Sequence, residues 1–184
     1  MKSCIAALLS AMLFVSCAAS LPYGIDYPLT DRTFRSRDGA FTGRVPQGWF
    51  SSTGDTLVPS VVAWLIKDDL SAALSIKELN LDRVTALRVE KDGLGLLAHI
   101  SAGLHQSGPD SATVAVAPRE FEMQGKKFCS YEIVNGGKRT RIVVFSAHGK
   151  FYECEAVPVK GQRPADELAR MFTAQQTFLA WLRF

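Results

Sequence analysis

The histidines and the paired acidic residues are the side chains of this sequence best suited to acid–base or metal chemistry. Three histidines are present, His99, His105 and His148. His99 and His105 stand six residues apart in a predicted helix, so the helical rotation takes them off a common face. Neither an HExxH motif nor a close Cys/His spacing accompanies them. We therefore expect no metal site, and we expect His148 to be solvated in a tight turn.

Two pairs of carboxylates stand close in the sequence, Asp68 with Asp69 and Glu153 with Glu155. A glycosidase places two carboxylates across a cleft. Here Asp68-Asp69 has the composition of a turn, and Glu153 and Glu155 are expected on a solvated strand face. The sequence also lacks the GxSxG nucleophile motif, the Walker loop and the full dinucleotide-binding fingerprint. These patterns predict a protein that is not an enzyme, with no catalytic residue and no cofactor.

The N-terminal stretch has the layout of a secretory signal peptide. Lys2 supplies one positive charge, the residues from Ile5 to Val15 are apolar apart from Ser10, and small residues follow. This apolar run is far shorter than the roughly 20 residues that span a bilayer. We expect export rather than a lasting transmembrane helix.

Cys17 directly follows this run, and Phe14-Val15-Ser16-Cys17 resembles the bacterial lipobox, with Phe14 where Leu is usual. Cleavage before a lipidated Cys17 would leave two or three acyl chains, which together give a lasting membrane anchor. The alternative is ordinary cleavage after Ser20, since Ala18 and Ser20 have the small-x-small spacing. The product would then be soluble in the periplasm or secreted. Ala18 in place of Asp after the cysteine points to the outer rather than the inner membrane.

Composition places the remainder of the chain in one globular domain of balanced charge. The chain has 184 residues, and loss of Lys2 with the signal lowers its formal net charge from +3 to +2. Such a balance does not favour nucleic acid as a partner. We divide the chain into a signal peptide (1–16), an extended tether rich in Pro and Gly (17–32) and a single domain (33–184).

Turn residues and hydrophobic periodicity divide that domain into strands, helices and strands again. Asp38-Gly39 predicts a hairpin turn. Asp82 is predicted to cap a helical region that Gly93 and Gly95 divide into a short and a longer helix. Pro164 opens a long closing helix. The expected strands cover residues 33–36, 40–45, 58–66, 71–79, 112–122, 127–134, 139–147 and 151–157.

The predicted strand at 139–147 carries apolar side chains on both of its faces. Val143 and Phe145 face one way, and Ile142 and Val144 face the other. A sheet with one solvated face would alternate cleanly between apolar and polar residues, so helices are expected on both faces. The fold class is therefore α+β, an α/β/α sandwich with a central, mainly antiparallel sheet.

Cys129 and Cys154 remain in this domain, and export makes a disulfide between them an option. If the hairpin turns centre near Gly136 and His148-Gly149, Cys129 pairs with Val143, and Val143 pairs with Cys154. The two cysteines would then lie on one face, two strands and about 9.6 Å apart. A disulfide needs Cβ atoms about 3.8 Å apart. We therefore predict two buried free thiols rather than a disulfide.

Five basic residues cluster in sequence around one predicted hairpin, namely Lys126, Lys127, Lys138, Arg139 and Arg141. Contact with anionic lipid or an envelope polymer is one interpretation of this patch. Protection of an edge strand by charge is the other, and it is the one we favour.

The order of elements and one motif resemble the PsbP-like family, which includes DcrB-type bacterial lipoproteins. The motif is Val45-Pro46-Gln47-Gly48-Trp49 at the end of the first strand pair, and the resemblance covers residues 34–184. It implies an α/β/α sandwich and members that bind protein partners, with no shared catalytic set. Only Pro46, Gly48 and Trp49 carry over, as residues that mark the fold.

These features predict a lipid-anchored, non-enzymatic protein of the bacterial cell envelope that binds a protein partner or contributes to envelope assembly. The alternative is a carrier of a small apolar ligand, with a pocket between sheet and helix near Trp49 or Trp64. A third hypothesis is a hydrolase whose residues meet only in space. A flat apolar patch would favour the first hypothesis, a deep enclosed apolar pocket the second, and a Ser/His/acid cluster the third.

Overall fold

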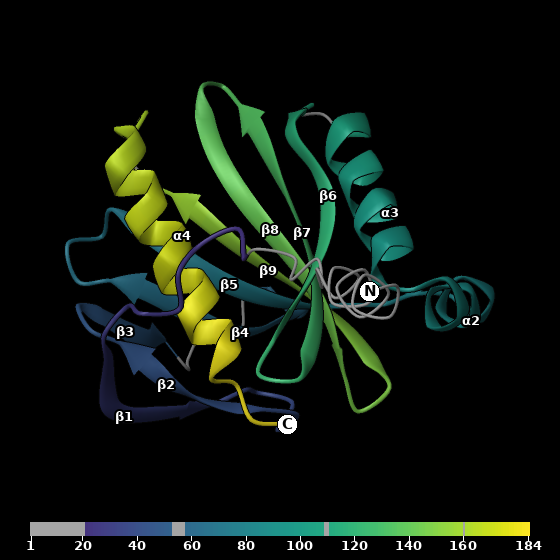
Figure 1. Cartoon of the computed structure of the whole chain (residues 1–184), viewed down its shortest axis with the longest axis horizontal. Helices are drawn as coiled ribbons and strands as arrows, with labels where there is room; N and C mark the ends of the chain where they lie inside the picture. Colours follow the sequence, from purple (N-terminus) through teal and green to yellow (C-terminus); the bar gives the residue numbers. More distant parts are fainter. Residues whose placement is uncertain (1–20, 53–57, 109–110, 160) are drawn as a thin grey trace, which may run out of the picture.

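The computed structural model describes residues 21–52, 58–108, 111–159 and 161–184. One antiparallel sheet of seven strands, in the order β3-β4-β5-β9-β8-β7-β6, forms its centre (Figure 1). The strands of this sheet are β3 (Trp49–Ser52), β4 (Val61–Lys67), β5 (Ala72–Leu79), β6 (Thr113–Met123), β7 (Lys126–Asn135), β8 (Lys138–Ala147) and β9 (Lys150–Pro158).

Helices cover both faces of this sheet. α2 (Arg83–Asp92) and α3 (Leu94–Ser107) follow β5, and α3 packs against β6, β7 and β8. α4 (Ala165–Ala180) crosses the opposite face, and α2 extends beyond the sheet on the side away from α4 (Figure 1). The expected α/β/α sandwich with a mainly antiparallel sheet is confirmed.

The strict alternation of the central strands divides the core into two clusters. Val143 and Phe145 of β8 belong to the cluster under α4, together with Phe172 and Phe178 of that helix. On the other face, Ile142 and Val144 pack with the buried side chains of α3. All four of these β8 residues are fully buried, so the two-sided burial that the sequence predicted for this strand is confirmed. Covering both faces removes apolar surface from water. Each Å² that is removed contributes roughly 25 cal/mol to stability.

Local signals set the helix boundaries as expected. The Asp82 carboxylate accepts hydrogen bonds from the backbone N–H groups of Val84 (2.9 Å) and Thr85 (3.0 Å), which caps α2. Gly93 separates α2 from α3 with a φ of +91°, a conformation that glycine adopts without strain. Gly95 lies inside α3, so Gly93 alone makes the break. α4 begins directly after Pro164.

The predicted hairpin around Asp38-Gly39 forms a separate two-stranded sheet. Its strands are β1 (Leu29–Arg35) and β2 (Thr42–Pro46), and they pair antiparallel. Phe34 and Phe41 of this hairpin are buried, and Phe34 packs on Phe178 of α4. The small sheet therefore covers the C-terminal end of α4 (Figure 1).

The predicted tether at residues 17–32 is wrong over the part that the structure describes. Tyr23 packs edge-on against Phe172 at a centroid distance of 5.3 Å, and the Tyr27 N–H donates to Thr177 Oγ1 at 3.1 Å. Pro and Gly in this segment suggested a linker, but its alternating apolar residues bury one side against α4. These residues are Leu21, Tyr23, Ile25 and Tyr27. The folded domain thus begins by residue 21.

The strand register around the two cysteines differs from the predicted one by one residue. The turn of the β7–β8 hairpin consists of Gly136 and Gly137, because Asn135 pairs with Lys138. Cys129 therefore lies opposite Val144 rather than Val143, while Cys154 lies opposite Val143. A shift of one residue moves a side chain to the other face of a sheet.

The two cysteines consequently occupy different layers. Cys129 packs in the α3 cluster and Cys154 in the α4 cluster. Both are buried and free, so the prediction of two buried free thiols is confirmed, although the predicted common row was wrong. Burial raises the pKa of each thiol to about 12.

Candidate functional site

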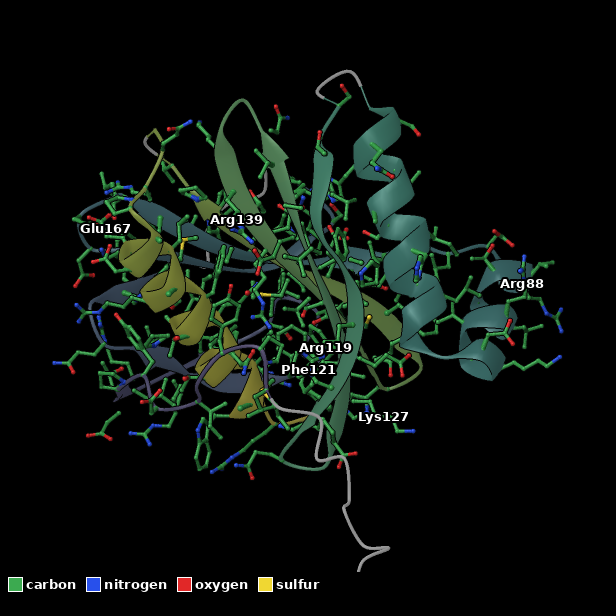
Figure 2. All side chains as sticks on the ribbon, turned by 45° about the horizontal axis from the view of Figure 1, so that its top comes forward. Arg88, Arg119, Phe121, Lys127, Arg139 and Glu167 are labelled. Atoms are coloured by element: carbon green, nitrogen blue, oxygen red, sulfur yellow. The ribbon has the colours of Figure 1, made fainter. Side chains whose placement is uncertain are left out.

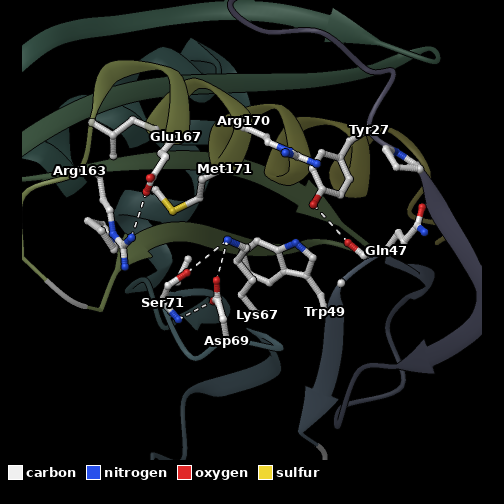
Figure 3. Close-up of a pocket in the computed structure, with 15 residues that line it drawn as sticks. Tyr27, Gln47, Trp49, Lys67, Asp69, Ser71, Arg163, Glu167, Arg170 and Met171 are labelled. Atoms are coloured by element: carbon white, nitrogen blue, oxygen red, sulfur yellow. Dashed lines mark hydrogen bonds and ion pairs between the residues drawn. The ribbon is translucent and has the colours of Figure 1, made fainter.

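A cleft of about 560 Å³ lies between the first half of α4 and two turns of the sheet. One turn joins β2 to β3, and the other joins β4 to β5. The Trp49 ring lies at the centre of the cleft wall, between side chains of these turns and side chains of α4 (Figure 3). The cleft is open to solvent and is lined by aromatic, apolar and charged groups together.

The Pro46-Gln47-Gly48-Trp49 motif builds one end of this cleft. Pro46 ends β2, and Trp49 begins β3, so the chain passes from the small sheet to the large one within two residues. Gly48 makes this passage with a φ of +78°, which favours glycine. Its carbonyl accepts from the Asp68 N–H at 3.0 Å, and this bond ties the passage to the β4–β5 turn.

Trp49 is 1% exposed and fills the space below the cleft. Its indole N–H has no acceptor among the described residues. An unsatisfied buried donor costs about 1–3 kcal/mol, so a large apolar side chain is held here in spite of that cost. Of the three residues expected to mark the fold, Gly48 and Trp49 therefore also line the cleft, and Pro46 ends the strand that leads to it.

The β4–β5 turn supplies a polar wall. Lys67 Nζ donates to Asp69 Oδ2 at 3.1 Å and to Ser71 Oγ at 3.3 Å (Figure 3). The Ser71 N–H donates to Asp69 Oδ1 at 2.9 Å. The hydrogen bonds from Ser71, with help from Lys67, lower the pKa of Asp69 to about 2. Asp69 is therefore ionised at neutral pH, and Lys67 has a fixed partner.

The α4 wall carries further charges of both signs. Arg163 pairs with Glu167 at 2.9 Å, one turn apart (Figure 3). The Arg170 guanidinium lies 6.0 Å from the centre of the Tyr27 ring, and the Tyr27 hydroxyl donates to the Gln47 carbonyl at 3.1 Å. The N-terminal segment, the β2–β3 turn and α4 are thereby joined around the cleft.

A second polar cluster lies on the other side of the sheet, under α3. Glu153 and Glu155, expected on a solvated strand face, point instead toward α3, with side-chain exposures of 5% and 13%. Ser101 donates to Glu153, and Tyr131 OH lies 2.8 Å from Ser101 Oγ. His105 Nε2 lies 3.5 Å from Glu153 Oε1. The prediction for these carboxylates was wrong because the sequence did not reveal that α3, packed on β6, β7 and β8, brings Ser101 and His105 to Glu153.

The pKa values of the two carboxylates in this cluster shift in opposite directions. Burial, together with the neighbouring Glu153, raises the pKa of Glu155 even though Lys77 donates to it. Burial opposes ionisation of Glu153 too, but His105 and Ser101 outweigh it and lower the pKa of Glu153. The hydrogen bond with Glu153 also raises the pKa of His105.

The order of contacts in this cluster is not that of a serine hydrolase. In a catalytic triad the histidine stands between the serine and the acid and takes the serine proton. Here Glu153 stands between Ser101 and His105, and the Ser101 hydroxyl donates to the carboxylate. The Ser101 hydroxyl thus has a carboxylate rather than an imidazole as its acceptor.

The predicted basic patch does not form. Lys126 begins β7, whereas Lys138 begins β8 and pairs with Asn135 at the other end of β7. Lys126 donates to the carbonyls of Ala180 (2.9 Å) and Leu182 (2.5 Å) at the end of α4. Arg141 is 1% exposed and bonds to side chains of α4. The interpretation that we favoured for these basic residues, protection of an edge strand by charge, is also wrong, because β8 lies inside the sheet.

Arg141 instead joins the sheet to α4 and to the N-terminal segment. Its two terminal nitrogens donate to Gln175 Oε1 (2.9 Å) and Gln176 Oε1 (2.8 Å), and its guanidinium lies 4.9 Å from the centre of the Tyr23 ring. Burial lowers the pKa of Arg141 to about 10, so it remains charged at neutral pH. Nothing in the sequence pattern distinguished it from its exposed neighbours.

The predicted lipidation site, Cys17, lies outside the described residues. No helix of the described part of the chain is both long enough and apolar enough to cross a membrane.

Comparison with protein-family models and with curated proteins found no match. Among solved structures, the chain is similar to the cyanobacterial PsbP protein CyanoP from Synechocystis sp. PCC 6803, with a TM-score of 0.53 and 13% identity over 83% of this chain and 91% of that one. It is also similar to the Ran-binding protein Mog1p from Saccharomyces cerevisiae, with a TM-score of 0.51 and 12% identity over 84% of this chain and 95% of that one. At such identities the likeness concerns the fold alone. The chain has a PsbP-like fold.

Proposed function

We propose that this chain is an exported protein of the bacterial cell envelope, anchored by lipid on Cys17, that binds a segment of a protein partner in the cleft beside Trp49. It acts by binding and carries out no reaction of its own. The outer membrane is the favoured location.

The anchor is supported by the first 20 residues. A single charge, a short apolar run and a cysteine at the end of that run form one pattern. The domain begins by residue 21, because Leu21 already packs against the core. A lipid on Cys17 would therefore hold the domain close to the membrane surface.

The cleft is the observation that carries the binding role. Its walls combine Tyr27, Trp49 and Met171 with Arg163 and Arg170, and these residue types are enriched at protein interfaces. Acidic groups of the cleft already engage basic ones in pairs, which leaves a mixed surface without one dominant charge. Such a surface suits a peptide segment with both polar and apolar side chains.

The same lining argues against the alternative of a small apolar ligand. A carrier of such a ligand uses an enclosed pocket with few polar groups, whereas this cleft is open and carries several charged side chains. The cleft does lie beside Trp49, one of the two places where the carrier hypothesis expected a pocket, but it is not the enclosed apolar pocket that the hypothesis requires.

Fractionation of cells tests the anchor. In a diderm bacterial host fed an alkyne-tagged fatty acid, the natural chain is expected in the membrane fraction with the tag attached. The Cys17→Ser chain is expected without the tag and in the soluble periplasmic fraction, because the anchor has been removed.

Sequencing of the mature N-terminus distinguishes the two processing routes. An unmodified N-terminus at Leu21 would show cleavage after Ser20 and a protein without a lipid. Cys17→Ser protein that stays in the membrane after its signal peptide has been cleaved would also contradict a lipid anchor on Cys17. A Cys4→Ser variant is the matched control and should behave as the natural chain does.

A further inference from the structure

The polar cluster under α3 contains three groups of the kind that bind metals. They are the His105 imidazole and the carboxylates of Glu153 and Glu155, and their ligand atoms all lie within 4.8 Å of one another. His105 Nε2 is 3.5 Å from Glu153 Oε1. Tetrahedral coordination at zinc bond lengths separates ligand atoms by roughly 3.3 Å, so small side-chain movements bring the three into range.

Regular elements position all three ligands. Glu153 and Glu155 are two residues apart on β9, so both side chains point to the α3 face. His105 lies in the last turn of α3, one turn after Ser101, which also faces Glu153. β9 is an interior strand of the sheet, and α3 packs on β6, β7 and β8 of the same sheet. The three groups are therefore brought together by the fold itself.

Hydrogen bonds from neighbouring side chains orient each carboxylate and leave one of its two oxygens available to bind a metal. Ser101 occupies Oε2 of Glu153, and Tyr131 in turn contacts Ser101. Lys77 donates to one oxygen of Glu155 at 2.5 Å. Each carboxylate keeps a second oxygen, Oε1 in Glu153 and Oε2 in Glu155. Partners of this kind are what orient ligands in protein metal sites.

The charges in the cluster also favour a cation. Two carboxylates lie side by side where little solvent reaches them, and Lys77 is the one lysine or arginine that pairs with either of them among the described residues. Like charges in close contact disfavour joint ionisation. A divalent cation between the carboxylates would remove that repulsion.

We propose that His105, Glu153 and Glu155 form a three-ligand site for a divalent transition metal, for which zinc is the best match. One imidazole with two carboxylates suits first-row divalent metals, whose affinity for such a set rises from Mn²⁺ to Cu²⁺ and falls again at Zn²⁺. Zinc is the best match because one His and two carboxylates with an open position form a tetrahedral set that zinc accepts. His105 and Glu155 also line a solvent-open depression of about 390 Å³. The metal reaches its ligands from there, and its remaining coordination position faces the same space.

Titration calorimetry with Zn²⁺ tests this site. The purified full chain carries Cys4→Ser and Cys17→Ser, so that thiols outside the described residues do not compete, and it is first stripped with EDTA. We expect one Zn²⁺ per chain and a higher melting temperature with the metal, because a ligand that binds only the folded state stabilises it. His105→Ala should weaken Zn²⁺ binding at least tenfold, and so should Glu155→Gln.

His99→Ala is the matched control, because His99 lies on the same helix, is exposed and has its hydrogen bond, among the described residues, with the Gly95 carbonyl one turn earlier. It should leave the Zn²⁺ affinity unchanged. Co²⁺ should give the visible absorption of a tetrahedral site. This absorption should be lost in Glu155→Gln, a variant that should still fold because Gln has nearly the same shape as Glu. Absence of Zn²⁺ binding, or an equal loss with His99→Ala and His105→Ala, would overturn the proposal.

Discussion

At the scale of single residues, two buried charged side chains connect the central strands to the helices on either side. Arg141 of β8 bonds to Gln175 and Gln176 of α4, and Glu153 of β9 bonds to Ser101 of α3. Hydrogen bonds to charged groups are the stronger kind, and deleting one partner leaves the others buried and unsatisfied. Because the two residues face opposite layers, each one fixes a different helix.

The buried thiols give a prediction at this scale. With a pKa of about 12, Cys129 and Cys154 would each be ionised in only about one molecule in ten thousand at pH 8. We expect negligible labelling by a thiol reagent in the native Cys4→Ser, Cys17→Ser chain at pH 8, and two labels per chain in 6 M guanidinium. Mass spectrometry counts the labels.

Rapid labelling of the native chain would contradict the buried, protonated state of these thiols. An unreduced chain that takes no label even in guanidinium would show a disulfide. That result would be incompatible with the two cysteines lying on opposite faces of the sheet.

At the scale of elements, the β7–β8 turn decides which residues face which layer. Gly136 and Gly137 have φ values of +54° and +77°, so both central positions are in the left-handed region. This is the pattern of a two-residue type I′ turn, which requires positive φ at both positions and favours Asn-Gly. The turn therefore sets the register that places Cys129 and Tyr131 under α3.

Substitutions in this turn should show that its second central position requires a residue that tolerates positive φ. Gly137→Val should lower the free energy of unfolding by about 1–3 kcal/mol, because a β-branched residue at positive φ is strained. Gly136→Asn is the matched control, since a Cβ at that position meets nothing within 4 Å and Asn suits the turn. Urea unfolding of both variants measures the difference. Equal stability of the two would show that the turn does not depend on glycine at the second position.

Most elements of the fold were predictable from the sequence, because turn residues and periodicity act locally. The Asp82 cap, the break at Gly93 and the strands of the β-rich half all follow from neighbouring residues. The face of the sheet to which each side chain points was harder to predict from the sequence. An error of one residue in the centre of the β7–β8 turn put both cysteines on one face.

The candidate sites were predictable only in part, for the same reason. Trp49 was expected near a pocket, and a cleft lies beside it. His105 and Glu153 are far apart in sequence and meet because α3 packs on the face of the sheet to which Glu153 points, so no spacing rule could have joined them. Alternating apolar residues between Leu21 and Tyr27 could have revealed that this segment packs on α4, but Pro and Gly obscured the pattern.

At the scale of the whole molecule, the sheet separates two regions with different properties. The cleft lies on the α4 side, and the His105 cluster lies under α3. Figure 2 shows Glu167, a residue of the cleft, and Arg88 of α2 at opposite sides of the molecule. A partner bound in the cleft would therefore leave α2 and the depression beside His105 accessible.

The most direct measurement of the proposed function is site-specific photo-crosslinking in intact cells. A photoreactive p-benzoylphenylalanine replaces Arg170, which is exposed and lines the cleft, or Arg88, which is exposed on α2. We predict one discrete protein adduct from position 170 and no such adduct from position 88. Lys67→Glu, which reverses a charge of the cleft wall, should reduce the adduct from position 170. Absence of a protein adduct at position 170, or the same adduct at position 88, would contradict partner binding in the cleft.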